Sequence, residues 1–262
     1  MRKATGLCAA RQSGYVGRMI LQHSLPYDPF ADRSLPGIAP LDMADWLIVD
    51  EAYAGQMAER ARLLAERPEE VLWRDPVAAG AEAELLAMVL DNLPAGFARD
   101  GDSVITPDGR RVTPDPDHAL ESCAALVQED LCLLIKEGEE HVLRAALLCF
   151  PASWRLAEKA GRALLAIHEP VHDYDLDLAR RVQRLFDGVQ PGRPLWRFNA
   201  LWYDDPTLFQ PRSASTPRPP TDRGRAGFFR SERQSILRLP ESGAVVFSIH
   251  TFVLPRDRVT RD

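Results

Sequence analysis

Two apolar segments near the end of the chain, joined by a short turn, constrain the fold more than any other feature. Gly243–Leu254 is rich in valine, isoleucine, phenylalanine and threonine, which favour β-strands. Ser231–Leu239 precedes it, and Pro240–Gly243 supplies the turn. Because so short a connection joins only antiparallel neighbours, the chain is predicted to build on an antiparallel β-sheet.

Further strands and helices are predicted between residue 96 and this final pair of strands. Short apolar or β-branched runs bounded by turn residues predict strands at Ser103–Thr106, Arg111–Thr113, Asp130–Lys136, His141–Phe150 and Leu195–Tyr203. Apolar residues at helical spacing predict helices at Asp117–Glu129, Trp154–His168 and Asp175–Val189. The fold class is therefore α+β, an antiparallel sheet of about five or six strands with inserted helices.

The first part of the chain has a different pattern. Residues 40–93 show helical periodicity, interrupted where Arg67 and Asp75 precede prolines. Residues 1–27 contain no acidic residue and resemble a transit peptide in composition, but we expect a disordered extension. We therefore predict an extension over residues 1–25 and one domain over 26–262, mainly helical over 26–95 and with the sheet over 96–262.

Composition excludes several functional classes. The net charge of -6 lacks the basic surplus of a nucleic-acid-binding protein. No apolar run approaches the roughly 20 residues that span a bilayer. The four cysteines have no close ligand spacing, so we expect free thiols in a reducing, cytoplasmic compartment. The familiar nucleotide-binding, hydrolase and metalloprotease motifs are absent.

One histidine ends a segment with unusual small residues. In the predicted helix Trp154–His168, small residues including Gly161 lie on the stripe that leads to His168. This arrangement would let a flat cofactor approach the backbone while the imidazole reaches its iron. Alternatively, His168 caps a carbonyl at the end of a core helix. Periodicity alone leaves both interpretations open.

Two ordered motifs carry a resemblance to a known family. The first is Phe150-Pro151, Trp154, Lys159-Ala-Gly161 and Ile167-His168-Glu-Pro170-Val171, and the second is Glu232-Arg233-Gln234 followed by Leu239-Pro240 and Ser242-Gly243-Ala244. Shorter matches occur at Trp46, Asp50, Glu129-Asp130 and Arg197-Phe-Asn199. Together these segments resemble the haem-dependent oxidative N-demethylase alpha-subunit family.

The resemblance implies a PAS-like haem b domain in which His168 is the axial iron ligand. It also implies oxidative removal of N-methyl groups from small methylated amines such as dimethylamine. Dioxygen and electrons from a separate reductase carrying FMN and an iron-sulfur cluster would be needed. The chain departs from the family pattern at His172, at Ala200-Leu201 and at His250-Thr-Phe252.

Polar residues on the predicted strands can be sorted by alternation. Arg197, Asn199 and Tyr203 share one face of their strand, and Glu232, Gln234 and Arg238 share one face of theirs. Arginines can hold haem propionates, for which the candidates are Arg197, Arg233 and Arg238. Glu232 can bind a cationic amine, and Tyr203 and His250 are further catalytic candidates. Alternatively, these residues form the solvated face of the sheet.

The remaining histidines and a long loop complete the predictions. We expect His23, His118 and His141 to face water. Residues 205–229 form a proline-rich loop that is either disordered or a lid, and its arginines, Arg212, Arg218, Arg223 and Arg225, are solvated or dock a reductase. A haem-based gas sensor and a haemless interaction subunit are the alternative functions.

Overall fold

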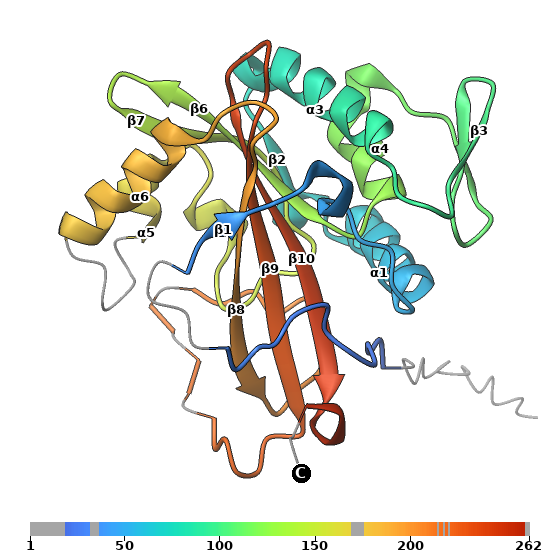
Figure 1. Ribbon diagram of the computed structural model, residues 1–262, viewed down its shortest axis with the longest axis vertical. Helices are drawn as coiled ribbons and strands as arrows, with labels where there is room; N and C mark the ends of the chain where they lie inside the picture. The colour runs from blue at the N-terminus through green and yellow to red at the C-terminus, as the bar shows by residue number, and fades with distance from the viewer. Residues whose placement is uncertain are drawn as a thin grey trace, which may run out of the picture.

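The computed structural model describes residues 19–31, 37–168, 176–213, 215–216, 218–219 and 221–259. A seven-stranded sheet in the order β1-β8-β9-β10-β6-β7-β2 dominates the molecule, and its paired strands are antiparallel (Figure 1). Its strands are β1 (Ala39–Pro40), β2 (Leu72–Arg74), β6 (Asp130–Glu137), β7 (Glu140–Leu147), β8 (Leu195–Tyr203), β9 (Phe228–Arg238) and β10 (Val245–Pro255). The α+β prediction is confirmed.

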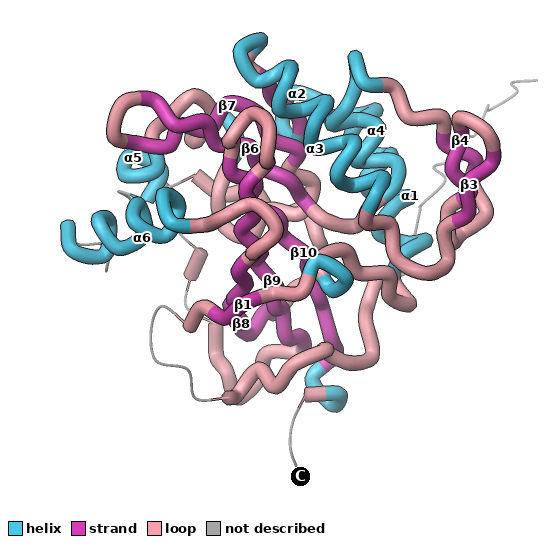
Figure 2. Tube along the Cα trace, turned by 45° about the horizontal axis from the view of Figure 1, so that its top comes forward, coloured by secondary structure: helices cyan, strands magenta, loops and turns pink. Residues whose placement is uncertain are grey.

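The helices that precede β6 in the chain and those that follow β7 lie in different places (Figure 2). The N-terminal half supplies α1 (Tyr53–Glu66), α2 (Pro68–Val71), α3 (Ala79–Asp91) and α4 (Ala119–Leu126). The short α5 (Leu164–His168) and α6 (Leu176–Gly188) come between β7 and β8 in the chain. They lie together beside β7, apart from the N-terminal helices, so the sheet separates two helical regions.

The two sides of the sheet bury different apolar clusters. Leu131, Leu133 and Leu237 pack with the N-terminal helices, including Leu63 of α1 and Leu85 of α3. On the other side, residues of alternate positions pack with α5 and α6; they are Cys132, Leu134, Ile236, Val245 and Ile249, with Leu164 and Phe186 from the helices. The period-2 alternation of the strands places these two sets on opposite faces. We call the second one the α5–α6 face.

The register of β8 and β9 brings together the polar residues predicted from alternation. Arg197 lies opposite Gln234 and Asn199 lies opposite Glu232. Directly paired residues of antiparallel strands point to the same side of the sheet. Ile236 is also on this side, so all four polar residues belong to the α5–α6 face.

The predicted continuous helix Trp154–His168 is wrong. Only Leu156–Glu158, as a 3-10 turn, and Leu164–His168 are helical. Gly161 adopts a φ of 70°, a conformation that side chains with a Cβ rarely adopt, and its amide donates to the Leu143 carbonyl at 3.1 Å. The chain therefore turns at Gly161 and pairs with β7, so the small residues predicted as a helical stripe do not line up.

The hairpin at residues 103–113 forms, but outside the main sheet. β4 (Ser103–Ile105) and β5 (Arg111–Val112) join β3 (Ala98–Asp100) in a separate three-stranded sheet. The prediction assigned all strands to one sheet because a sequence indicates a hairpin but not its neighbours. β8 has the predicted bounds, and α6 begins and ends within one residue of its predicted range.

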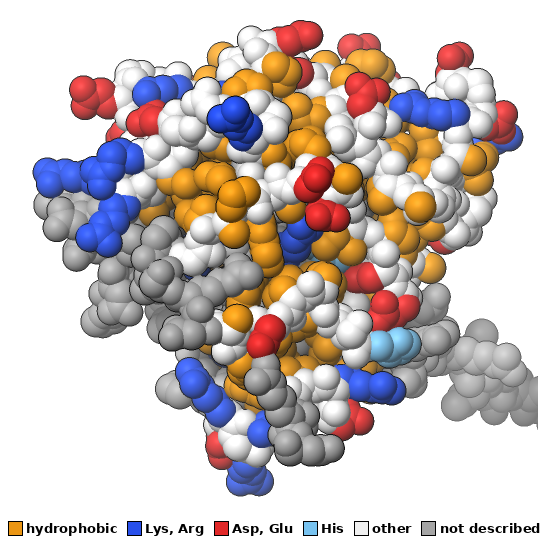
Figure 3. All heavy atoms as spheres, in the orientation of Figure 1, with side chains coloured by type: hydrophobic (Ala, Val, Ile, Leu, Met, Phe, Trp, Pro, Cys, Tyr) orange, Lys and Arg blue, Asp and Glu red, His pale blue; other side chains and the backbone are white. Residues whose placement is uncertain are grey.

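Basic side chains gather at one place on the face that Figure 3 shows. In Figure 3 the positive side chains gather over α6, where Arg180, Arg181 and Arg184 are exposed. Apolar side chains cover much of the middle of the same view. No helix within the described ranges is both long and apolar enough to cross a lipid bilayer. The described cysteines, Cys123, Cys132 and Cys149, are buried and free.

Candidate functional site

Four polar side chains from β8 and β9 form a strip on the α5–α6 face. We call Arg197, Asn199, Glu232 and Gln234 the polar strip. Glu232 is buried, Arg197 and Gln234 are half-buried, and Asn199 is exposed. The strip therefore runs from the interior to the surface, as a site that admits a small ligand must do.

The carboxylate of Glu232 is oriented by its neighbours. Its Oε2 accepts hydrogen bonds from Asn199 Nδ2 and Gln234 Nε2, each at 3.2 Å. Its Oε1 lies 3.9 Å from Arg230 Nη2 and receives no hydrogen bond from the described residues. One oxygen is thus held by neutral amides while the other can still accept a hydrogen bond from a ligand.

Arg197 lacks a counter-charge among the described residues. Its Nε atom is buried without a hydrogen-bond partner there. Burial alone lowers the pKa of Arg197, because no described carboxylate lies near enough to offset the desolvation of the guanidinium. Leaving a cation half-buried without an anion is unfavourable, so the guanidinium is suited to an anionic group that the described residues do not provide.

Partly buried apolar side chains lie in the same cluster as the core under α5 and α6. They include Leu195 at the start of β8, Phe247 on β10, Ile167 on α5 and Trp154. A flat apolar macrocycle with carboxylate side groups needs an apolar surface beside a cation. The combination of these residues with the unpartnered Arg197 Nε atom fits such a group.

The two other predicted arginines hold backbone carbonyls. Arg238 donates from Nε to the Val189 carbonyl at 2.7 Å and from Nη2 to the Phe186 carbonyl at 2.6 Å, so it caps the C-terminal end of α6. Arg233 lies on the opposite face and donates from Nη1 to the Asp45 carbonyl at 2.6 Å. Both guanidinium groups therefore bind backbone carbonyls of the protein. Arg233 is also separated from the polar strip by the sheet.

His250 also lies on the opposite face, where it pairs with Arg233 across β9 and β10. Its Nε2 is 3.1 Å from Asp50 Oδ2 and its Nδ1 is 2.9 Å from Glu129 Oε1. Burial alone would lower the pKa of His250, but the hydrogen bonds and charges of the two carboxylates raise it to about 9. His250 is therefore a buried imidazolium between two carboxylates, and the sheet lies between it and the polar strip.

A second charge pair extends this region. Arg60 of α1 lies with Nη1 2.9 Å from Asp130 Oδ1, and both side chains are fully buried. Asp130 also accepts from the amides of Cys149 and Phe150, each at 2.8 Å. We call Asp50, Arg60, Glu129, Asp130 and His250 the buried charge network. Its members join the N-terminal helices to β6 and β10.

Tyr203 lies at the far end of β8 from Arg197, about 20 Å away at the usual rise per strand residue. The guanidinium of Arg218 stacks on the Tyr203 ring at 3.7 Å. Arg218 and Arg212 are half-buried rather than fully solvated, whereas Arg223 and Arg225 are exposed, and the docking alternative stays a prediction. The stacking places Arg218 of the loop against the end of β8.

Sequence reasoning missed Arg230, which is buried beside Glu232 on the α5–α6 face. Its Nη2 donates to the Phe150 carbonyl at 2.7 Å and its Nη1 to the Leu208 carbonyl at 2.9 Å. The predicted strand began at Ser231, one residue too late to include it. Extending the alternation by two residues from Glu232 would have identified Arg230.

The histidines divide differently from the prediction. His23 and His118 are exposed as expected, but His141 is fully buried, so that prediction is wrong. α6 covers His141, whose Nδ1 lies 2.9 Å from Gln183 Nε2 and whose Nε2 has no described partner. His168 is the last residue of α5. Its backbone is described, whereas its side chain and all of His172 lie outside the described residues.

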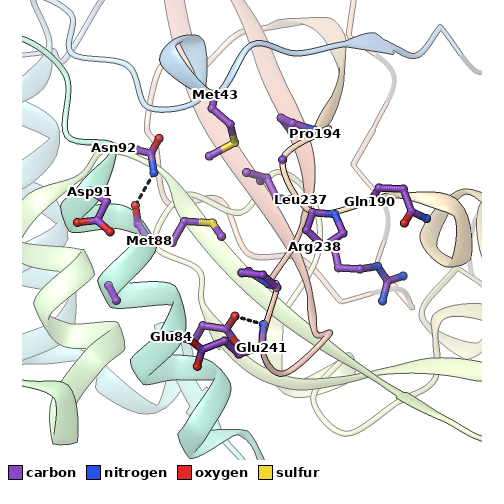
Figure 4. Close-up of a pocket in the computed structure, with 14 residues that line it drawn as sticks. Met43, Glu84, Met88, Asp91, Asn92, Gln190, Pro194, Leu237, Arg238 and Glu241 are labelled. Carbon is purple, nitrogen blue, oxygen red and sulfur yellow. Dashed lines mark hydrogen bonds between the residues drawn. The ribbon is translucent and has the colours of Figure 1, made fainter.

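A separate pocket of about 440 Å³ lies between α3, the turn at residues 190–194 and the turn between β9 and β10 (Figure 4). Met43, Met88 and Leu237 point into it, and Glu84 and Asp91 lie along one side. Glu84 accepts from the Glu241 amide at 2.7 Å and so holds that turn. Of the predicted site residues only Arg238 lines this pocket, which therefore differs from the polar strip.

Residues 37–262 match the family described as haem-dependent oxidative N-demethylase, alpha subunit-like. The match includes the ten described strands, α1 to α6, the polar strip and the buried charge network. It extends beyond the two motifs that suggested the resemblance and covers most of the chain. The chain therefore belongs to the haem-dependent oxidative N-demethylase alpha-subunit-like family.

Proposed function

We propose that this protein is the haem-binding oxygenase subunit of an oxidative N-demethylase that acts on a small methylated amine. In this proposal the sheet is PAS-like, haem b binds on the α5–α6 face, and His168 is the axial ligand. The observation that carries it is the half-buried Arg197, without a described counter-charge beside a partly buried apolar surface. Membership of the haem-dependent family supports the identity of the group.

Haem, when bound, supplies the chemistry that puts one atom of dioxygen into an N-methyl group, while two electrons and two protons convert the other atom into water. The hydroxylated methyl group leaves as formaldehyde, and the amine gains a hydrogen. The electrons are proposed to come from a separate flavin and iron-sulfur subunit, consistent with the family being named for an alpha subunit.

The chain's own residues would bind the two organic groups. Arg197 would donate paired hydrogen bonds to a propionate, because its planar fork matches a carboxylate. Glu232 would accept from the N–H of a cationic secondary amine at Oε1, since Oε2 is already held by two amides. The apolar residues beside them exclude water from the methyl group.

The remaining predicted residues would act at a distance from the amine. Tyr203 and Arg218 would close one end of the face through their stacking contact. Arg238 would keep α6 in place through its carbonyl contacts. His250 and Arg233 would support the strands from the opposite face. These roles are indirect, so their substitution should leave the haem spectrum largely unchanged.

An absorption spectrum and a product assay test the proposal. Apoprotein titrated with haem should develop a Soret band, and the reduced holoprotein under air should release formaldehyde from dimethylamine or a related methylamine. His168→Ala should abolish or greatly weaken haem binding, with partial recovery of the spectrum when imidazole is added. A Soret band without formaldehyde from any methylamine would instead support the gas-sensor function.

His141 provides the matched control for the ligand assignment. It is a buried histidine that contacts α6 and has a ring nitrogen without a described partner. His141→Ala and His250→Ala should both retain the Soret band. Loss of the band in His141→Ala with retention in His168→Ala would assign the iron to His141 and contradict the proposed ligand.

A further inference from the structure

Lys159 is a buried lysine whose ammonium group has no described ion-pair partner. Only 8% of its surface is exposed, and no carboxylate among the described residues forms an ion pair with it. Its Nζ donates to the backbone carbonyl of Ile167. Burying an ammonium group without an anion is unfavourable, so this contact calls for a specific explanation.

The acceptor carbonyl belongs to the last turn of α5. The final carbonyls of a helix have no partner within the helix, and a lysine can bind them and favour the negative end of the helix dipole. Ile167 directly precedes His168, the last residue of α5. The Lys159 ammonium group therefore closes the end of the helix that carries the proposed ligand.

α5, with five residues, is too short to be stable without contacts to the rest of the protein. Isolated helices shorter than about 12 residues are marginal in water, so α5 depends on contacts with the rest of the protein. Its start is fixed to β7, because the Leu143 amide donates to the Arg162 carbonyl at 3.0 Å and Ala163 pairs with Val142. Leu164 anchors the first turn in the core. At the other end, Lys159 donates the described side-chain hydrogen bond.

We propose that Lys159 is a positioning residue for His168, fixing the C-terminal end of α5 and hence the point from which the imidazole reaches the haem iron. This inference rests on the proposed function, since it requires His168 to be the ligand. It also gives a physical role to the lysine of the Lys159-Ala-Gly161 motif. Gly161 makes the turn toward β7, and Lys159 reaches from that turn to the end of α5.

The test compares Lys159→Met, which removes the donor but keeps a long apolar side chain, with Lys159→Arg, which keeps a cationic donor. Lys136→Met is the matched control, because Lys136 is an exposed lysine paired with Asp187. Amide hydrogen exchange is first measured on the apoproteins. Exchange of the Ile167 amide should be about tenfold or more faster in Lys159→Met, since a hydrogen bond from a charged group is lost. It should be close to wild type in the other two variants.

Haem titration and ferric EPR spectra then measure the effect on the ligand. Lys159→Met should bind haem about tenfold to a hundredfold more weakly, as expected when a group that orients a metal ligand is removed. Its EPR spectrum should show a broader range of axial geometries, and Lys159→Arg should restore both properties. If Lys159→Met does not fold, Lys159→Leu, which also lacks a donor, takes its place with the same expectations.

The outcomes that would overturn the inference can be told apart. If His168→Ala loses haem while Lys159→Met keeps wild-type affinity and EPR spectrum, the proposed ligand stands and the positioning role of Lys159 is wrong. If His168→Ala keeps haem, the ligand assignment fails and the role of Lys159 fails with it. Faster exchange in Lys159→Met without any change in haem affinity also counts against the inference.

Discussion

The two faces of strands β8 to β10 treat charge in opposite ways. On one face His250 lies between Asp50 and Glu129, so a buried charge meets opposite charges. At the start of β6, beside this group, Arg60 pairs with Asp130 in the same way. On the other face the half-buried Arg197 meets no described carboxylate, and Oε1 of Glu232 receives no described hydrogen bond. The first arrangement is complete among the described residues, whereas the second leaves groups without partners there.

The difference separates residues that stabilise the fold from residues that can bind. A folded protein loses stability when one partner of a buried ion pair is removed. Substitutions in the buried charge network should therefore lower the free energy of unfolding. A group whose partner is a ligand contributes little to the stability of the apoprotein and can even lower it. Stability and haem affinity should therefore respond to different residues.

The largest effect on stability is expected from Asp130→Asn. The substitution leaves Arg60 buried without its ion-pair partner, and its NH2 group replaces one of the two oxygens that accept from the Cys149 and Phe150 amides. The free energy of unfolding of the apoprotein should fall by about 3–5 kcal/mol, measured by urea denaturation. Asp187→Asn, which breaks an exposed ion pair with Lys136, should cost at most about 1 kcal/mol. Equal losses would show that burial of the network has no energetic consequence.

The second prediction is a pH dependence of stability that belongs to His250. The folded pKa of about 9 lies above the ordinary value of 6.5, so the imidazolium stabilises the fold fully below pH 6.5. This contribution is lost as the pH rises through 9, and it amounts to about 3 kcal/mol. The Asp50 carboxylate shares this coupling. Burial alone would raise the pKa of Asp50, but hydrogen bonds with His250, Gln128 and Gln22 lower it.

The difference in unfolding free energy between wild type and His250→Gln isolates the contribution of the His250 imidazolium. Thiols, tyrosines and lysines also titrate at alkaline pH, but they contribute equally to both proteins. The difference in unfolding free energy should be largest near pH 6 and should shrink steadily between pH 7 and pH 10. A constant difference across this range would mean that His250 is neutral in the folded protein, contrary to the paired geometry.

Arg197→Met should lower haem affinity and leave stability nearly unchanged, the opposite of substitutions in the buried charge network. Because Arg197 is desolvated without a described counter-charge, the apoprotein should change in stability by no more than about 0.5 kcal/mol. Its haem affinity should fall about tenfold to a hundredfold, the value of a charged hydrogen bond to a propionate. Arg197→Lys should recover part of the loss, because it keeps the charge without the planar fork. A loss of stability with unchanged haem affinity would assign Arg197 to the fold.

Most of the sheet could be predicted from sequence, because alternation and turn residues are local signals. β8 was predicted with its observed bounds, and its pairing with β9 placed Arg197 and Glu232 on one face. The break in the predicted helix Trp154–His168 was not visible, since a single glycine within a helical pattern is tolerated and Gly161 gave no stronger signal. Local sequence patterns do not indicate that residues 161–163 form backbone hydrogen bonds with β7 instead of continuing a helix.

Contacts across the chain explain the other differences. His250 is separated from Asp50 by 200 residues and from Glu129 by 121, so no sequence window contains the group. His141 follows two acidic residues and was expected to face water, but α6 covers it. Arg218 was expected to be solvated because its loop is rich in proline and arginine, yet it stacks on Tyr203. Each error concerns a side chain whose environment is set by a distant element.

The smallest expected effect comes from exposed arginines that take part in neither arrangement. Arg223 and Arg225 lie on the surface of the long loop, so replacing both with serine should change the free energy of unfolding by less than about 0.5 kcal/mol. If this loop docks an acidic electron-donating subunit, the double variant should accept electrons several-fold more slowly at low ionic strength. The difference should vanish near 0.5 M salt, where screening reduces the Debye length to about 4 Å.

A matched variant locates the docking surface. Arg181 and Arg184 of α6 form the other exposed basic group, beside the helix that carries His168. Because electrostatic attraction acts on the rate of encounter, whichever pair faces the partner should change the rate of reduction without changing the Soret band or the unfolding curve. A salt-dependent loss in Arg181→Ser/Arg184→Ser with none in Arg223→Ser/Arg225→Ser would move the docking surface from the loop to α6.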